Sequence, residues 1–356
     1  MLRIKVNLFK LLRTNDKSYI FAPMKFVFKI FFVVLTVISL TGCADYQKIL
    51  KGDDYEVKFL EANRQYESGN YGKAIALYEQ IYQRFPRTDQ GKVSYFRIAN
   101  SYYKENDYVM AGYYFNQFSI RYPTDPKTEE ATFMMAMCSV HNSPSYTLDQ
   151  SETVLALNDL QVFVQRYPQS EYVDSCNNIM DRLRFKIETK SFEAVKLYDK
   201  TENYRAAVTS SKAFLEEYPQ SSYIEEVTLL EFENAHKLAM LSILSIQKER
   251  IEDALDIYGR YKSYFQTKRS VANYTTRMYE ELQKELAVVE EKYSYNAIVE
   301  AYQQSNSTSQ QKKVRFLKET IVRFNTFAKK HPNSSLMNKA ENIHKRAERE
   351  LENINK

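Results

Sequence analysis

Three segments of the chain share one pattern: NYGKAIALYEQIYQRFP at residues 70–86, DYVMAGYYFNQFSIRYP at 107–123 and NYRAAVTSSKAFLEEYP at 203–219. In each, a tyrosine is followed three residues later by an alanine, and in the first two an aromatic residue follows four positions after that alanine. Such offsets place side chains on one face of an α-helix. Each segment ends in proline, which cannot continue a helix. The pattern predicts repeated amphipathic helices in which alanine permits a neighbouring helix to approach closely.

The ending of these segments recurs along the chain. It reads RFPRTD at 84–89, RYPTDP at 121–126, RYPQSE at 166–171 and EYPQSS at 217–222, with a weaker echo, KHPNSS, at 330–335. A second helical stretch precedes each segment, for example KFLEANRQYESG and VSYFRIANSYYKEN. A helix, a tight turn, a second helix and a proline, at spacings of 37, 45 and 51 residues, resembles the tetratricopeptide repeat with insertions. The resemblance implies an all-α, helical-repeat solenoid of about five repeats with a C-terminal capping helix.

The composition agrees with a helical protein, since glycine is scarce (7 residues), proline is modest (8) and segments with strand-like alternation are missing. We expect repeats 1–3 at residues 54–168 and repeats 4–5 at 169–265. A degenerate helical repeat and its cap are expected at 266–356, interrupted by a polar loop at 303–311.

A short apolar segment, from about Phe26 to Leu40, precedes the repeats. It is shorter than the roughly 20 apolar residues that a membrane span needs. Its basic start and small-residue end are typical of a secretory signal. Residues 40–43, Leu-Thr-Gly-Cys, resemble the lipobox of bacterial lipoproteins, which implies that residues 1–42 are removed and that Cys43 becomes the lipidated start of a linker at 43–53. We expect Met24 to be the natural start. The alternative is a buried anchor or core helix that ends in cysteine.

The charge of the chain argues against a nucleic-acid partner. The whole sequence carries a formal charge of +5, but residues 1–42 hold seven basic residues and one acidic residue. The remainder therefore has 43 basic and 44 acidic residues, a net charge of −1. A phosphate-binding protein would carry its positive surplus on the working domain.

The amino-acid sequence of the repeats, over about residues 50–235, resembles that of the BamD family of lipoproteins. It runs FPRTDQGKVSYFRIANSYYKENDYVMAGYYFNQFSIRYP, then LNDLQVFVQRYPQSEYV, then DRLRFKIETKSFEAVKLYDKTENYRAAVTSSKAFLEEYP. That family belongs to the machinery that folds β-barrels into the outer membrane. The resemblance implies a non-enzymatic scaffold, lipid-anchored on the periplasmic face of the outer membrane. Its implied partners are a BamA-like barrel protein with periplasmic domains and unfolded β-barrel substrates.

Helical spacing aligns two sets of candidate peptide-binding residues on consecutive first helices of the repeats. The sets are Phe59, Asn63 and Tyr66, and Phe96, Asn100 and Tyr103. Asparagine amides can satisfy the backbone groups of an extended peptide, while the aromatic side chains offer apolar contacts. The alternative is that these residues serve packing within the repeats.

The resemblance also implies that the late repeats hold the barrel partner. Residues 312–330 are amphipathic, and their basic residues Lys313, Arg323 and Lys330 are candidates for a docking rim. The alternative is that the apolar face of this segment packs on the capping helix at 334–354.

Other classes of function stay open. A SusD-like lipoprotein for glycan or nutrient binding is usually longer and commonly stacks sugars on tryptophan, which this chain lacks. A general envelope scaffold and an envelope enzyme are further alternatives. The four histidines lie apart without metal-ligand spacing, so neither a catalytic site nor a cofactor is expected. Buried free thiols are predicted for Cys138 and Cys176, with a disulfide as the alternative.

Overall fold

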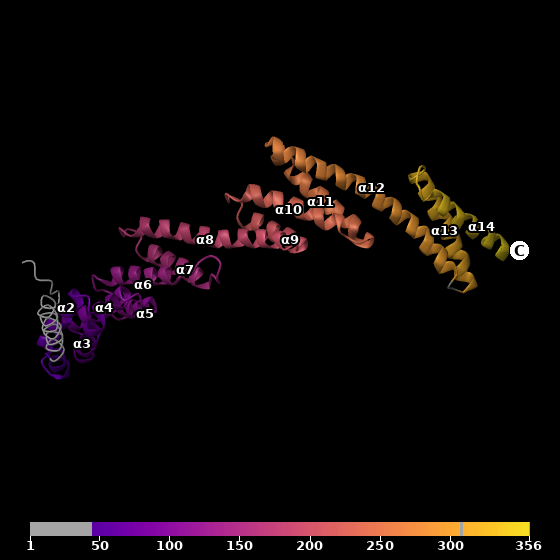
Figure 1. Ribbon diagram of the computed structural model, residues 1–356. Coiled ribbons are helices and arrows are strands. Elements are labelled where there is room, and N and C mark those ends of the chain that lie inside the picture. Colours follow the sequence, from indigo (N-terminus) through magenta and orange to yellow (C-terminus); the bar gives the residue numbers. More distant parts are fainter. Residues whose placement is uncertain (1–44, 307–308, 356) are drawn as a thin grey trace, which may run out of the picture. The chain divides into compact units, whose positions relative to one another are not determined.

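The structure is a computed structural model that describes residues 45–306 and 309–355 (Figure 1). Every regular element within those residues is a helix and none is a strand, which confirms the predicted all-α class. In the same two stretches, no helix has both the length and the apolar character that crossing a bilayer requires. Cys43 and the predicted leader lie outside the described residues.

The helices form two compact units, one ending at Arg184 and the other beginning at Phe185, so the boundary falls inside α8 (Val173–Lys200). The first unit starts with a helical stretch at residues 45–51. Helices then follow as hairpins joined by short turns (Figure 1). They are α2 (Tyr55–Glu67), α3 (Tyr71–Arg84), α4 (Asp89–Lys104), α5 (Tyr108–Arg121), α6 (Thr128–Asn142) and α7 (Ser151–Arg166).

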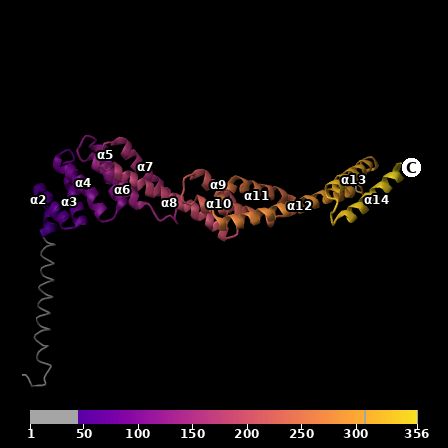
Figure 2. The same ribbon diagram turned by 90° about the horizontal axis from the view of Figure 1, so that it is seen from above.

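The second unit continues from α8 with six helices. They are α9 (Tyr204–Glu217), α10 (Ile224–Met240), α11 (Leu244–Phe265), α12 (Arg269–Asn306), α13 (Gln310–Lys330) and α14 (Met337–Asn355). The 38-residue helix α12 packs on α11 along its first part and on α13 along its second part (Figure 2). The polar segment 303–311 is less of a loop than predicted, because α12 continues to Asn306 and α13 begins at Gln310.

The turn inside a hairpin depends on one residue in the left-handed region. This residue is Gly69 (φ 77°) after α2, Asn106 (φ 62°) after α4 and Glu202 (φ 58°) after α8. The residue after it donates its backbone N–H to the carbonyl five residues back, as Asn70 does to Gln65 at 2.9 Å. This bond ends the helix with satisfied carbonyls. Glycine adopts this conformation without strain, whereas glutamate does not.

The turn between hairpins is the recurring ending seen in the sequence. In all five copies, the residue three positions after the aromatic residue (or His331) donates its backbone N–H to that residue's carbonyl at 3.0–3.2 Å. The same residue's side-chain oxygen accepts a backbone N–H from the start of the next helix at 2.9–3.2 Å. Proline in the second position fixes the φ that such a turn needs. The weaker echo at 330–335 therefore forms the same turn as the four clear copies.

The core of each hairpin is built from alanines and rings. Ala74, Ala111 and Ala207, the alanines of the shared pattern, are all fully buried. Rings gather at the hairpin ends, where Phe133 stacks on Tyr172 with centroids 4.2 Å apart and Phe192 stacks on Tyr223 at 4.1 Å. Small residues let the helices approach closely, and the rings fill the space beside them.

The two cysteines within the described residues are free thiols, so the predicted buried thiols are confirmed and the disulfide alternative is wrong. Both side chains are buried. Burial raises the pKa of Cys138 to about 12 and also raises the pKa of Cys176. A thiol with a raised pKa carries little thiolate near neutral pH, which makes both cysteines poor nucleophiles.

Candidate functional site

The candidate site is the surface of the first helices α2 and α4, defined here by Asn63, Tyr66, Arg97, Asn100 and Tyr103 and called the first-helix face. Arg97 connects the two helices. Its Nη1 donates to Asn63 Oδ1 at 2.9 Å, and its guanidinium lies over the ring of Tyr66, 4.9 Å from the ring centroid. The geometry joins residues 34 positions apart into one charged and aromatic surface.

A buried tyrosine supports this arrangement from below. Tyr78 of α3 has no exposed surface, and its hydroxyl donates to Asn63 Oδ1 at 2.7 Å while accepting from Arg97 Nη1 at 3.1 Å. Burial raises the pKa of Tyr78 to about 12, although Arg97 acts in the opposite direction. The hydroxyl therefore keeps its proton and its hydrogen bond to Asn63 at neutral pH.

Two amide atoms of the face stay available to a ligand. Among the described residues, neither Asn63 Nδ2 nor Asn100 Oδ1 has a hydrogen-bond partner, whereas Asn100 Nδ2 makes a long bond of 3.4 Å to the Phe96 carbonyl. The face thus offers one free donor and one free acceptor on adjacent helices. These are the two groups that a peptide backbone needs.

The far end of the face is aromatic. The Tyr103 hydroxyl lies 2.8 Å from His141 Nε2, and the His141 ring stacks on Tyr108 with centroids 4.3 Å apart. These side chains come from α4, α5 and α6, so the face extends onto the third first helix of the unit. Neither His141 nor Arg97 was predicted from the sequence as a site residue, since their partners lie on other helices, 19 to 38 positions away.

The two phenylalanines predicted for this surface are placed differently. Phe96 is 5% exposed and packs against Phe115 and Phe118, with centroid distances of 5.6 and 5.3 Å. Phe59 is half-buried and meets Tyr78 edge-on at 6.5 Å. Each lies three residues before a fully buried alanine of its helix, a packing position, so neither phenylalanine is included in the first-helix face.

The three basic residues predicted as a docking rim all have partners inside the second unit. Lys313 pairs with Glu350 at 2.8 Å and Lys330 with Glu290 at 3.0 Å. Arg323 donates to the Ala297 carbonyl at 2.7 Å and to Glu319 at 2.6 Å. The three side chains are nevertheless 31–54% exposed.

The apolar face of α13 packs largely inside the second unit, in agreement with the alternative that it packs on the capping helix. Leu317 is fully buried, Phe327 is 1% exposed, and the Phe324 ring lies 4.2 Å from that of His344 on α14. Val322 is the exception on this helix, with 62% of its surface exposed.

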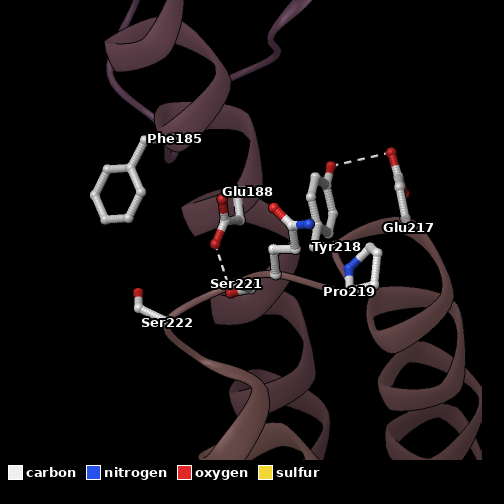
Figure 3. A pocket seen from close by; sticks show the side chains of 8 residues that line it. Phe185, Glu188, Glu217, Tyr218, Pro219, Ser221 and Ser222 are labelled. Atoms are coloured by element: carbon white, nitrogen blue, oxygen red, sulfur yellow. Dashed lines mark hydrogen bonds between the residues drawn. The ribbon is translucent and has the colours of Figure 1, made fainter.

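A hollow in the second unit has no counterpart among the sequence predictions. Figure 3 shows it beside the turn that follows α9, where α8 contributes Phe185 and Glu188. Its volume is about 480 Å³. The remaining lining residues are Glu217, Tyr218, Pro219, Gln220, Ser221 and Ser222.

Comparison with known proteins gives one family. Residues 53–250 match the family model YfiO, described as an outer membrane lipoprotein. The outer membrane protein assembly factor BamD of Caulobacter vibrioides is 24% identical over 197 residues, which are 54% of this chain and 65% of that protein. The chain therefore matches slightly less than two thirds of that relative. BamD of Neisseria gonorrhoeae is 24% identical over 205 residues (54% and 77%), and BamD of Vibrio cholerae is 19% identical over 229 residues (62% and 95%).

Proposed function

The chain belongs to the YfiO family of outer membrane lipoproteins, and we propose that it assists the assembly of β-barrel proteins in the outer membrane. The predicted resemblance to BamD proteins is confirmed by the matched relatives. The observation that carries the proposal is the extent of the family match, which runs over residues 53–250 and so includes every hairpin of the first unit and the first-helix face.

The proposed anchor is a lipid on Cys43, which would hold the protein on the periplasmic face of the outer membrane. The family description and the lipobox support it together. Several acyl chains hold a protein on a bilayer without a spanning helix, because each buried methylene contributes about 0.8 kcal/mol. Mass spectrometry of the N-terminal peptide of the native protein is expected to show acyl groups on Cys43. An unmodified thiol there would contradict the anchor.

The proposed substrate surface is the first-helix face. An unfolded barrel segment presents unpaired backbone groups and alternating apolar side chains. The free amide atoms of Asn63 and Asn100 suit the backbone, and the rings of Tyr66 and Tyr103 suit apolar side chains. Arg97 already neutralises part of the nearby acidic charge through its 3.6 Å contact with Glu67, so an uncharged segment meets no unpaired charge at the centre of the face.

Site-specific photo-crosslinking tests the substrate surface. Asn63 accepts hydrogen bonds from both Arg97 and Tyr78, so replacing it would disturb the face itself. The crosslinking residue is therefore better placed at Asn100 and at the exposed Glu67. The probe is a purified outer-membrane β-barrel protein diluted from urea. Ile120, 62% exposed on the second helix α5, is the control position. We expect capture at 67 and 100 and little at 120, whereas equal capture at all three positions would remove the assignment.

The proposed docking surface for a BamA-like partner is the outer side of α13, with Val322 as its apolar centre and Lys313, Arg323 and Lys330 as its rim. Deleting residues 306–356 is a poor test, because it would expose Ile298 of α12, which is fully buried. Val322→Asp changes the surface without touching the core. We expect this variant to recover less barrel partner from solubilised membranes. Recovery equal to wild type, with unchanged thermal unfolding, would place the docking surface elsewhere.

A further inference from the structure

The hollow beside the turn after α9 combines an exposed ring with acidic groups. Phe185 is 50% exposed, and its ring stacks on Tyr223 with centroids 5.9 Å apart and an interplanar angle of 19°. Tyr223 stacks in turn on the buried Phe192 at 4.1 Å. Tyr223, itself held by Phe192, thus orients a ring that is half exposed to solvent, at the edge of a hollow of about 480 Å³ (Figure 3).

Two carboxylates face the same hollow. Glu188 of α8 accepts the hydroxyl proton of Ser221, and Glu217 of α9 accepts that of Tyr218 at 3.0 Å (Figure 3). Burial, the hydrogen bond to Glu217 and the negative charges of Glu217 and Glu188 together raise the pKa of Tyr218 to about 12, so both carboxylates act on one hydroxyl. No basic residue is among the described residues that line the hollow.

The five equivalent turns show that this arrangement is unusual within the chain. The residue just before the turn's aromatic residue or histidine is basic in four of them: Arg84, Arg121, Arg166 and Lys330. The fifth turn carries Glu217.

The basic residues of the other turns lie over aromatic rings or pair with carboxylates of their own unit. The Arg166 guanidinium lies 5.4 Å from the Tyr167 centroid, and that of Arg84 lies 5.9 Å from the Phe85 centroid. Lys330 pairs with Glu290 at 3.0 Å. At the fifth turn, the charge of this position is reversed, while the turn itself keeps its backbone hydrogen bond of 3.0 Å. The reversal is therefore not required for folding of the turn.

We propose that this hollow binds an arginine side chain presented by an extended segment of a partner protein. The guanidinium would stack on the outer side of Phe185 and pair with Glu188. Glu217, which Figure 3 shows beyond the Tyr218 ring, would add a second negative charge to the hollow. Arginine suits the hollow better than lysine, because its planar group stacks on rings and bonds carboxylates in a fixed fork. The hollow shares no residue with the first-helix face or with α13, so the inference does not depend on the proposed function.

Ligand-detected NMR tests the site directly. The full-length protein is solubilised in detergent, and saturation transfer is measured to the peptide Ac-Ala-Arg-Ala-NH2. The same peptide with citrulline, a neutral analogue of arginine, is the ligand control. We expect saturation transfer to the arginine side chain and at least about tenfold weaker binding of the citrulline peptide, because a neutral group loses both carboxylate interactions.

Three variants separate the site from general electrostatics. Glu217→Arg restores the residue type of the other turns and is expected to fold normally while weakening binding more than about tenfold. Phe185→Ala is expected to weaken binding about two- to fivefold, since an exposed cation–π contact contributes about 0.5–1 kcal/mol. Glu226→Arg, on the exposed surface of α10 outside the hollow, is expected to bind as wild type.

Several results would overturn the proposal. They are equal binding of the arginine and citrulline peptides, unchanged binding by a folded Glu217→Arg protein, and an equal loss in Glu217→Arg and Glu226→Arg. An arginine peptide that shows no saturation transfer to wild-type protein would overturn it as well.

Discussion

Two phenylalanines near the same turn should differ sharply in their contribution to stability. Phe214 of α9 has no exposed surface and contacts Tyr218, Phe192 and Tyr223, with ring centroids 5.0, 6.3 and 6.5 Å away. Replacing it with alanine removes buried surface and leaves a cavity between helices that are held by rings. We expect Phe214→Ala to lower the free energy of unfolding by about 3–5 kcal/mol.

Phe185→Ala is the matched control, because it is the same substitution at the edge of the same ring cluster. Half of the Phe185 surface is already exposed, and among the described residues its ring stacks on Tyr223 alone. The loss is limited to part of the transfer free energy and one stacking contact, and no closed cavity forms. We expect a cost of about 1 kcal/mol.

Urea unfolding measures the two free energies, and hydrogen exchange with mass spectrometry shows where the loss falls. In a helical-repeat protein each hairpin is stabilised by its immediate neighbours, so local weakening stays near its origin. Phe214→Ala should speed exchange in α8, α9 and α10 and leave α2–α5 nearly unchanged. A cost below about 1 kcal/mol for Phe214→Ala, or equal costs for both variants, would show that the ring cluster does not hold the turn.

Four further substitutions test single features of the backbone and of charge. Gly91→Ala would place a Cβ 1.9 Å from the carbonyl oxygen of Phe85 and should destabilise the protein by more than about 2 kcal/mol in urea unfolding. Gly259→Ala is the control, because a Cβ there meets no atom within 4 Å, and it should stabilise the protein by about 0.5–1 kcal/mol. Glu202→Gly should raise the free energy of unfolding by about 1 kcal/mol, because it relieves a left-handed residue with φ of 58°. Burial lowers the pKa of His236 despite the 3.3 Å contact with Glu281, so the unfolded chain binds the proton more readily and stability should fall as pH drops below about 6.5; His236→Gln should reduce that slope between pH 7 and 5.

The helices and their ends could be predicted because the signals are local. The turn between hairpins is fixed by a proline, one backbone bond over three residues and one side-chain cap, all within six positions of sequence. The helix α12 could not be foreseen as one element. It packs on α11 with its first part and on α13 with its second part, without a break. The polar residues before Gln310 are compatible with either a helix end or a loop.

The residues predicted for the candidate site differ in how deeply the structure buries them, and the difference has one physical cause. Spacing along a helix identifies the residues that share a face but does not tell whether that face is covered. Phe96 shares its face with Asn100, and yet α5 buries Phe96. The partner of Asn63 is Arg97, a residue 34 positions later on the next first helix, and no local pattern predicts that contact.

The basic residues of α13 show the same difficulty for charge. Amphipathic spacing correctly separates the apolar stripe from the charged side of the helix, but it assigns the charges to solvent. Lys313 meets Glu350 and Lys330 meets Glu290, at sequence distances of 37 and 40 residues. Ion pairs across neighbouring helices depend on which helices pack together, and this information is not contained in any single helix.

The repeated fold gives meaning to one sequence difference, the acidic residue Glu217 at a position that is basic in the other four turns. Once the structure shows that five turns share one backbone geometry, the residue before each aromatic residue or histidine becomes comparable across copies, and Glu217 is the acidic exception. The turn forms equally well with arginine, lysine or glutamate at this position, so folding does not select the charge. The reversed charge lies near an exposed ring and a second carboxylate, so its effect is expected on the surface potential of this hollow, which is what the proposed arginine site uses.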